Sequence, residues 1–261
     1  MLLPFTETIR NRHGERLDAA LHATPGTGAG SPPRTVVVIG HGVTSNKDRP
    51  WLVELAEAVA AAGLAALRVS FAGNGASDGR FEDCTLTKET EDLGSVLDAL
   101  EANGASTLAY VGHSMGAAVG VLRASRDRRI ACLVSLAGMV HVQAFMQRHF
   151  AGLVQGRDLM LDKPGCVWNR ALAEDAERIG SVTPGAAMVS VPWLLVHGDA
   201  DEMVPLGDAL DARAASAGGA EVVTLAGADH RFTGRMPEVI DVVVSWLLRN
   251  LGKAGAPASG G

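Results

Sequence analysis

Short apolar runs alternate with helix-like patterns through most of this chain, and this rhythm restricts the fold more than any other feature. After each run typical of a buried strand, apolar residues recur every three or four positions, as they do on one face of a helix. The apolar runs lie at residues 36–39, 64–71, 107–111, 130–136, 191–197 and 221–225. Strands that alternate with helices predict an α/β fold with a mostly parallel central sheet and helices on both faces.

A single α/β domain over residues 1–251 accounts for most of the 261 residues. Residues 5–22 alternate weakly between apolar and polar types, which favours a β-hairpin. Residues 25–33 contain the pattern G-x-G-x-x, but they precede a strand and end in two prolines, so they predict a surface linker and not a nucleotide-binding loop. The small and polar residues 252–261 predict a flexible tail.

Residues 139–189 interrupt the rhythm, because they are too many to connect one helix to the next strand. Apolar residues from Val142 to Leu153 recur at helical spacing, and a second short helix is expected at residues 169–179. We interpret this segment as a small helical lid inserted between two strands of the sheet. Long connections inside compact domains are usually functional.

Gly112-His113-Ser114-Met115-Gly116 forms a G-x-S-x-G pattern between an apolar run and a helix of small residues. In that context the pattern predicts a nucleophile elbow, a strained turn that exposes the serine Oγ and points the first amide of the helix at the same place. The sequence therefore predicts that Ser114 is a nucleophile.

A serine hydroxyl at neutral pH needs a general base, and the base needs an orienting carboxylate. Residues 191–197 form an apolar run that ends just before Asp199, Asp201 and Glu202, and residues 221–225 form another that is soon followed by His230. Because the carboxyl ends of parallel strands meet at one edge of a sheet, we expect these groups to gather there with Ser114. The chain order Ser, Asp, His is that of α/β-hydrolases.

From residue 5 to residue 251 the chain resembles the α/β-hydrolase superfamily. Residues 41–48, His-Gly-Val-Thr-Ser-Asn-Lys-Asp, are similar to the H-G-F-T-x-N-K segment of cinnamoyl and feruloyl esterase-like serine hydrolases. Residues 73–83 are similar to the G-x-G-x-S-D-G-x-F-E-D loop of the same proteins. The resemblance implies the α/β-hydrolase fold, and a catalytic triad of Ser114 as nucleophile, His230 as base and Asp201 as orienting acid.

The same resemblance implies an oxyanion hole formed by the backbone amides of Val43 and Met115. Val43 replaces the phenylalanine common in those proteins, which matters little for a backbone donor but changes the side chain at the pocket wall. For the acid, Asp199 and Glu202 remain alternatives, although the spacing to Val204-Pro205 resembles the family pattern with Asp201 as the acid.

Other histidines compete with His230 for the role of base. His113 and His197 fit structural or surface roles, and His41 fits the support of the oxyanion turn. His141 and His149 belong to the lid, where they could at most touch substrate. Chain order and placement at a strand end favour His230.

The residues together predict a serine hydrolase that cleaves carboxylic esters with small to medium or aromatic acyl groups. A thioesterase or an aminoacyl peptidase would use the same triad, and a non-catalytic ligand-binding protein with a hydrolase-like fold is a further alternative. Candidate substrate-binding residues in the lid are Phe145, Met146, Phe150 and Trp168, with Met160 beside them. The alternative that these side chains only pack the lid on the body is left open.

Charge and composition exclude several other classes. The net charge of −6 argues against nucleic acid and anionic membranes as partners. Three cysteines cannot all pair and match no metal spacing, so we expect reduced thiols, an inert Cys84, no metal and no cofactor. With no signal peptide and no membrane-length apolar stretch in view, a soluble cytoplasmic enzyme is expected. The oligomeric state stays open, a homodimer included.

Overall fold

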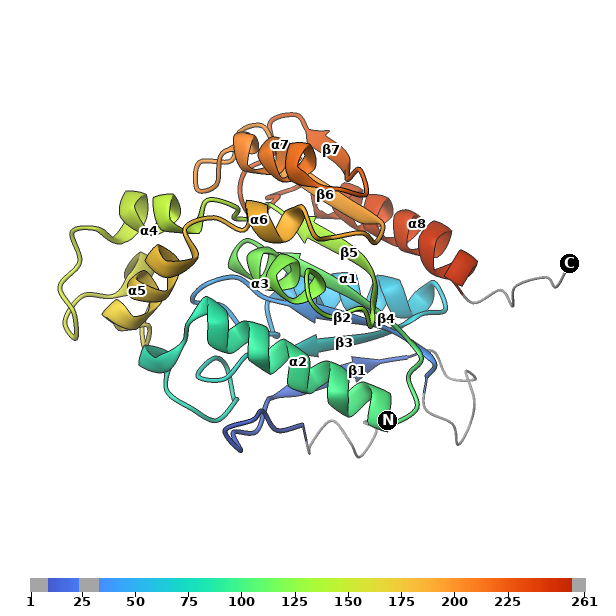
Figure 1. The fold of residues 1–261 in the computed structure, drawn as a ribbon, viewed down its shortest axis with the longest axis horizontal. Coiled ribbons are helices and arrows are strands. Elements are labelled where there is room, and N and C mark those ends of the chain that lie inside the picture. The colour runs from blue at the N-terminus through green and yellow to red at the C-terminus, as the bar shows by residue number, and fades with distance from the viewer. Residues whose placement is uncertain (1–8, 24–32, 255–261) are drawn as a thin grey trace, which may run out of the picture.

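The computed structural model describes residues 9–23 and 33–254, whose strands form one sheet in the order β1-β3-β2-β4-β5-β6-β7 (Figure 1). β1 is antiparallel to β3, and every other neighbouring pair is parallel, which confirms the predicted α/β class. The strands are β1 (Ala19–His22), β2 (Thr35–Gly40), β3 (Ala65–Val69), β4 (Thr107–His113), β5 (Ile130–Leu136), β6 (Trp193–Gly198) and β7 (Glu221–Leu225).

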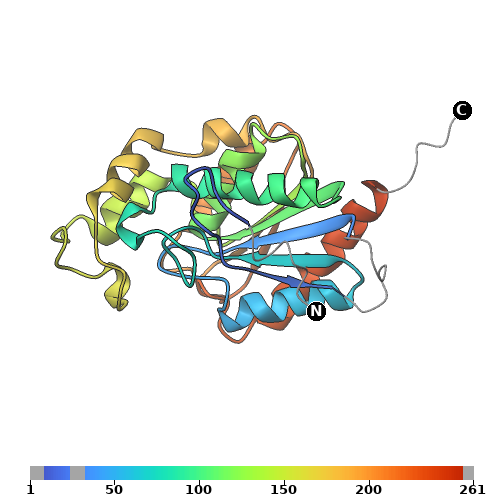
Figure 2. The same ribbon diagram turned by 90° about the horizontal axis from the view of Figure 1, so that it is seen from below.

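Helices cover both faces of the sheet (Figure 2). The helices are α1 (Pro50–Ala61), α2 (Leu86–Ala102), α3 (Met115–Ala124), α4 (Val142–Phe150), α5 (Arg170–Ile179), α6 (Thr183–Ala186), α7 (Leu206–Ala215) and α8 (Met236–Ala254), with short 3₁₀ turns η2 (Phe81–Asp83) and η3 (Met160–Asp162). α1 and α8 pack on one face, whereas α2, α3 and α7 pack on the other. Each face buries its own cluster of aliphatic side chains, and this burial is the main favourable term in folding.

The parallel register aligns the loops that form the site. Gly40 of β2 lies opposite Gly112 of β4, so the turn that follows β2 lies beside the turn that follows β4. Gly198 of β6 lies opposite Leu225 of β7, so the loops after these two strands also leave the sheet together. The carboxyl ends of four strands therefore converge at one edge, as expected for a parallel sheet.

Two predictions about the ends of the chain differ in extent from what the structure describes. A short hairpin forms around the turn at residues 11–14, with a bridge between Arg10 and Arg16 and a hydrogen bond from the Leu17 amide to the Ile9 carbonyl at 2.8 Å, but β1 pairs with β3 and not within this hairpin. At the other end α8 continues to Ala254, past the predicted start of the tail at residue 252. The linker at residues 25–32, residues 5–8 of the hairpin and residues 255–261 of the tail lie outside the described residues.

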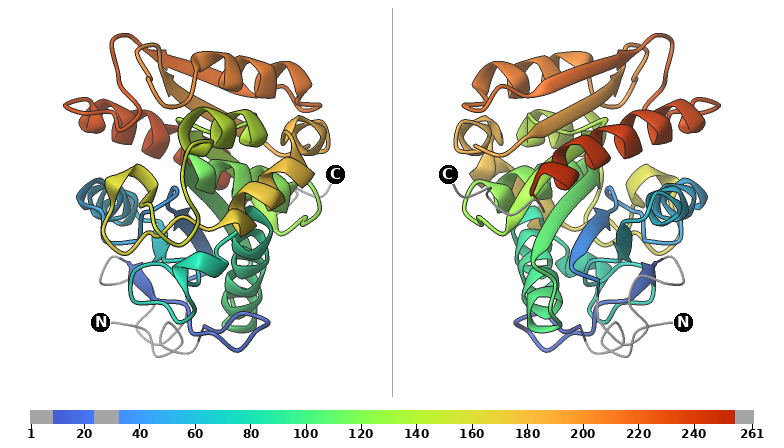
Figure 3. Two further views of the ribbon diagram at one scale, coloured as in Figure 1. Left: turned by 90° about the vertical axis from the view of Figure 1, so that its left-hand side faces the viewer. Right: turned by 90° about the vertical axis from the view of Figure 1, so that its right-hand side faces the viewer.

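The insertion between β5 and β6 carries α4, η3, α5 and α6, and its larger helices lie beyond one end of the sheet (Figures 1 and 3). The predicted second helix is α5, which begins at Arg170 after Asn169 caps its first turn. Hydrogen bonds fasten the insertion to the body: Asp175 of α5 accepts from the Thr87 amide at 2.8 Å and from the Thr87 hydroxyl at 2.7 Å. In the described part of the chain, no helix has both the length and the apolar character needed to span a bilayer.

Candidate active site

Ser114 occupies the turn between β4 and α3 in a backbone conformation that non-glycine residues seldom adopt, with φ 53° and ψ −118°. The turn is fixed on both sides. The Ser114 amide donates to the Leu136 carbonyl at 2.9 Å, and the Ser114 carbonyl accepts from the Met139 amide at 3.2 Å. Such strain is characteristic of functional turns that their surroundings hold in place.

The two glycines of the pattern are required by close packing of backbone. A Cβ on Gly112 would collide with the carbonyl of Gly116, and a Cβ on Gly116 would collide with the carbonyl of His41. The first turn of α3 therefore lies directly against the turn after β2. Only glycine at both positions allows this approach.

His230 lies in the loop after β7, and its Nε2 accepts a hydrogen bond from the Ser114 Oγ at 3.1 Å. The His113 ring packs against the His230 ring at a centroid distance of 4.9 Å, and the His113 Nε2 donates to the His230 carbonyl at 3.0 Å. Burial, together with the neighbouring His230 ring, lowers the pKa of His113 to about 3, so His113 remains a neutral donor. His113 thus holds the backbone of the residue that contacts the serine.

Asp201, in the loop after β6, completes the chain of hydrogen bonds. Its Oδ2 accepts from the His230 Nδ1 at 2.9 Å, and its Oδ1 accepts from the amides of Met203 at 2.9 Å and Val204 at 2.8 Å. Burial opposes ionisation of Asp201, but the hydrogen bonds from His197, His230 and the Val204 amide outweigh burial and lower the pKa of this carboxyl group. An ionised Asp201 fixes the tautomer of His230 that leaves its Nε2 free to accept a proton.

The two alternative acids lie elsewhere. Asp199 is exposed and accepts a hydrogen bond from the Gly227 amide at 2.6 Å. Glu202 is also exposed. Of the three carboxylates considered from the sequence, the structure joins Asp201 to His230.

His197 contacts the same carboxylate, which the sequence did not indicate. Its side chain is 1% exposed, and its Nε2 lies 2.9 Å from the Val204 carbonyl and 3.3 Å from the Asp201 Oδ2. Among the described residues its Nδ1 has no hydrogen-bond partner. The available signal was its position at a strand end, four residues before Asp201, but spacing alone does not show which way a side chain points.

The backbone amides expected to form an oxyanion hole lie on the two turns that pack together. Met115 begins α3, where amides have no partner within the helix, and Val43 lies in the turn after β2. His41 supports that turn, because its Nε2 accepts from the Phe71 amide at 3.0 Å and its Nδ1 donates to the Gly42 carbonyl at 2.9 Å. Burial lowers the pKa of His41 to about 4, so the ring is neutral and serves as a support.

Comparison with known proteins identifies the family and the fold. The family described as serine aminopeptidase, S33, matches residues 31–161, which is half of the chain and includes both turns. The chain belongs to this family of α/β hydrolases. The resemblance noted from the sequence is thereby confirmed, and none of the curated proteins compared matches the chain.

Solved structures share the fold of this hydrolase over nearly its whole length. The esterase Est1E from Butyrivibrio proteoclasticus, solved with ferulic acid bound, is 25% identical with a TM-score of 0.80, covering 94% of this chain and 98% of that one. The esterase Pf2001 from Pyrococcus furiosus is 20% identical with a TM-score of 0.72 and coverages of 92% and 90%. A monoacylglycerol lipase from Paleococcus ferrophilus is 20% identical with a TM-score of 0.69 and coverages of 90% and 99%. The last two show the fold alone.

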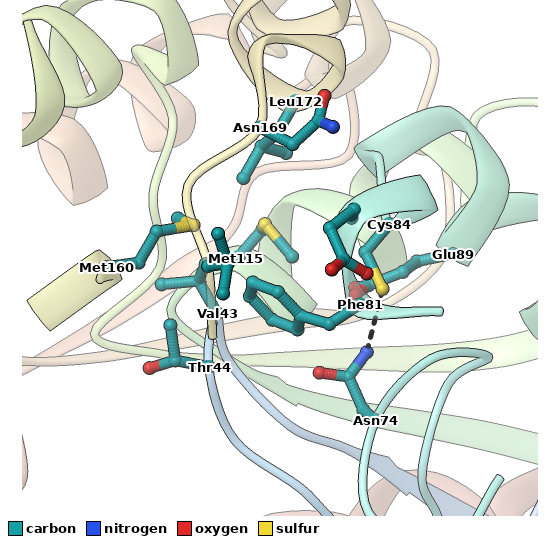
Figure 4. A pocket seen from close by; sticks show the side chains of 12 residues that line it. Val43, Thr44, Asn74, Phe81, Cys84, Glu89, Met115, Met160, Asn169 and Leu172 are labelled. Carbon is teal, nitrogen blue, oxygen red and sulfur yellow. Dashed lines mark hydrogen bonds between the residues drawn. The ribbon is translucent and has the colours of Figure 1, made fainter. Parts of the chain in front are cut away.

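A pocket adjoins the two amide-bearing turns of the hydrolase, and the space between its walls, open solvent included, is about 300 Å³ (Figure 4). Its walls come from the turn after β2, from the segment that leads into α2, from α2 and α3, and from the insertion. The lining residues are Val43, Thr44, Asn74, Phe81, Glu82, Cys84, Glu89, Met115, Met160, Val167, Asn169 and Leu172.

The predicted substrate-binding residues of the insertion do not line this pocket. They are buried and pack on one another: the Phe150 ring lies 5.9 Å from that of Phe145 and 5.4 Å from that of Trp168. Met146 is buried in the same cluster. Helical spacing identified the apolar face of α4 correctly. These side chains contact one another and belong to the same buried cluster as side chains of α2 and α3, in line with the alternative that they pack the insertion on the body.

The insertion reaches the pocket through other residues. Met160, the lid candidate that does line it, is joined there by Val167, Asn169 and Leu172. Lys163 also donates a hydrogen bond to the Thr44 carbonyl, which ties the insertion to the turn that carries Val43. Movement of the insertion would therefore change the pocket and the oxyanion turn together.

Cys84 and the remaining histidines take no part in the hydrogen bonds around Ser114. The Cys84 thiol donates to the Ala72 carbonyl at 3.0 Å, and burial raises the pKa of the thiol, which keeps it protonated. His141 contacts Asp211 at 2.8 Å, and His149 contacts the Met203 carbonyl at 3.0 Å. Among residues 9–23 and 33–254, no group of His, Cys, Asp and Glu is arranged to hold a metal ion.

Proposed function

We propose that this hydrolase cleaves carboxylic esters through an acyl-enzyme formed on Ser114. The observation that carries the proposal is the continuous hydrogen-bonded chain from the Ser114 Oγ through both nitrogens of His230 to Asp201, at 3.1 Å and 2.9 Å. Spacings of this size are those of a nucleophile and base ready to exchange a proton.

In the first half of the reaction, the Ser114 Oγ attacks the ester carbonyl carbon while His230 Nε2 takes its proton. In this proposal the Val43 and Met115 amides donate hydrogen bonds to the negative charge that forms on the carbonyl oxygen. His230 then gives its proton to the departing alkoxide, which leaves as an alcohol, and the acyl group remains bonded to Ser114.

Water completes the cycle. His230 takes a proton from water as the oxygen attacks the acyl carbon, and the proton is then returned to the Ser114 Oγ as the carboxylic acid leaves. Throughout, the ionised Asp201 stabilises the imidazolium form of His230. The likeness to Est1E with ferulic acid bound favours small to medium or aromatic acyl groups as the substrate class.

The first test is turnover of a p-nitrophenyl ester together with labelling by a fluorophosphonate. We expect burst kinetics and a single labelled residue, Ser114, because among the described residues only this serine has a base on its hydroxyl. Replacement Ser114→Ala should lower kcat by about 10⁴- to 10⁶-fold while circular dichroism shows the fold retained. A folded chain that neither hydrolyses esters nor reacts with the probe would overturn the proposal.

The matching family suggests a second candidate, release of an aminoacyl group from an amide. The triad is the same for both reactions, because the pocket and the leaving group decide between them. Esters, thioesters and aminoacyl amides of one acyl group, compared by kcat/KM, separate the candidates. We expect the ester to be the best substrate.

A further inference from the structure

The pocket beside the oxyanion turns has a polar end as well as an apolar wall. Asn74, Cys84 and Glu89 lie together at this end, opposite Met160 and Leu172 (Figure 4). The Asn74 Nδ2 lies 3.3 Å from the Cys84 sulfur, and the Cys84 thiol donates to a backbone carbonyl. Asn74 and Cys84 are thus hydrogen-bonded to each other and to the backbone.

Glu89 differs from these neighbours. It lies on α2, is only 1% exposed, and reaches toward Cys84 and Phe81 at the pocket in Figure 4. Its Oε2 has no hydrogen-bond partner among the described residues. A buried polar atom without a partner is costly, and in native proteins such atoms are rare enough to require a reason.

The charge state of Glu89 decides what this side chain could bind. Burial, followed by repulsion from the nearby Asp92 carboxylate, raises its pKa well above the ordinary value. A neutral carboxylic acid offers one O–H donor and a carbonyl acceptor. It therefore matches a neutral polar group, such as a hydroxyl, better than a cation.

The position of the pocket indicates which part of an ester would reach it. The leaving alcohol must lie against His230, because His230 donates the proton that releases it. The pocket is lined by Val43 and by Met115, the neighbour of Ser114 in the chain, but by neither Ser114 nor His230 themselves. The acyl chain, which stays bonded to Ser114, is thus the part that can extend into it.

We propose that Glu89 is a specificity-determining residue of the acyl pocket, where it hydrogen-bonds a hydroxyl group carried by the acyl chain of the ester. The substrate class would then be esters of hydroxy acids, a refinement that rests on the proposed esterase function. A site with a buried polar group discriminates strongly against a substrate that leaves this group unpaired.

The test compares acyl chains of equal length with and without the hydroxyl. We would measure kcat/KM for p-nitrophenyl 6-hydroxyhexanoate against heptanoate, and for 8-hydroxyoctanoate against nonanoate. In Glu89→Leu the preference for the hydroxyacyl ester should fall about tenfold at the chain length that reaches Glu89, the size expected for one lost hydrogen bond. Glu89→Gln keeps a neutral donor and acceptor, and it should retain the preference within about threefold.

Glu101→Leu is the matched control, since Glu101 lies on the same helix but is exposed at its far end. The preference of this variant for the hydroxyacyl ester should equal that of the unaltered enzyme. An unchanged preference in Glu89→Leu at both chain lengths, or an equal fall in Glu101→Leu, would overturn the proposal. If Glu89→Leu does not fold, Glu89→Met removes the same hydrogen-bonding group and is judged by the same criteria.

A binding measurement separates this proposal from the esterase function. The intact esters would be titrated calorimetrically into Ser114→Ala and into Ser114→Ala/Glu89→Leu. Tighter binding of the hydroxyacyl ester, lost in the double variant, supports the Glu89 site even if no ester is hydrolysed. Hydrolysis of both esters without selectivity, and equal binding of both, would overturn the Glu89 site and leave the esterase function standing.

Discussion

Two buried carboxyl groups, one hydrogen-bonded to His230 and the other in the pocket lining, have opposite surroundings. Asp201, in the loop after β6, accepts hydrogen bonds at both oxygens, and its pKa is lowered. Glu89, on α2, has an oxygen without a partner, and its pKa is raised. The comparison teaches that burial alone does not set the charge of an acid, because the donors around it decide.

The difference matches what each region has to do. A charge that forms on His230 during the reaction needs a fixed negative partner, and Asp201 is held ionised beforehand by donors that are already in place. A neutral group on a substrate needs a neutral partner. The Glu89 carboxyl group keeps one oxygen atom without a hydrogen-bond partner until such a substrate binds. The predictions below test whether these two carboxyl groups are as different as their surroundings imply.

The largest effect is expected at Asp201, the ionised one of the two carboxyl groups. Asp201→Asn should lower kcat/KM by about 10⁴-fold, because an amide stabilises the wrong tautomer of His230 and carries no charge to support the imidazolium. Asp199→Asn, two residues away and directed at the Gly227 amide, should stay within about twofold of the unaltered enzyme. Ester hydrolysis near neutral pH measures both.

A reversed result, with Asp199→Asn inactive and Asp201→Asn active, would show that the loop rearranges when substrate binds. Both variants should remain folded by circular dichroism, since each changes a carboxylate to an amide of the same shape. The fluorophosphonate should label Ser114 slowly in Asp201→Asn and at the usual rate in Asp199→Asn.

The neutral carboxyl group, Glu89, should make the stability of the protein depend on pH. Glu89 has a folded pKa above its ordinary value of 4.5, so above that pH the unfolded chain loses a proton that the folded chain keeps. The free energy of unfolding should therefore fall with rising pH by up to about 1.4 kcal/mol per pH unit, until the pH reaches the folded pKa. In Glu89→Leu this contribution is absent.

Urea unfolding at pH values from 5 to 8 would measure the effect as the difference in slope between the two proteins. Glu101→Leu again serves as the control, because it removes an exposed carboxylate from the same helix. Asp201 has the opposite sign: its stabilisation is present above its ordinary pKa and is lost as the pH falls through its lowered folded pKa. Identical slopes for Glu89→Leu and the unaltered protein would mean that Glu89 is ionised in the folded state.

The sequence predicted the elements of the sheet closely, because strand and helix periodicities are local properties. It also predicted that Ser114 and His230 lie at one edge of the sheet, since a motif and the parallel topology suffice for that prediction. Choosing Asp201 over Asp199 required a resemblance, because two carboxylates in one loop are equivalent until the loop conformation is known.

What the sequence missed depends on packing between distant segments. In the sequence Glu89 is an ordinary helix residue. Only the packing of α2 against the pocket buries its carboxyl group and leaves an oxygen atom without a hydrogen-bond partner. Phe150 and Trp168 were candidate substrate-binding residues, but their rings pack against one another within the insertion. Periodicity identifies the apolar face of a helix without naming what covers it.

The smallest effect is expected at His197, a positioning residue that acts on the site through Asp201. His197→Leu removes the donor 3.3 Å from the Asp201 Oδ2 and leaves the Val204 carbonyl unpaired, so the carboxylate should be held less firmly. We expect kcat to fall about tenfold with KM nearly unchanged, since a misplaced base affects the reaction and not the binding of substrate. His197→Gln, whose amide can donate from a similar position, should recover most of the loss. Two outcomes would contradict this role: a rise in KM without a fall in kcat, or no recovery in the glutamine variant. Either would mean that His197 fills space in the core and does not orient the carboxylate, because a structural role would not distinguish the two replacements in this way.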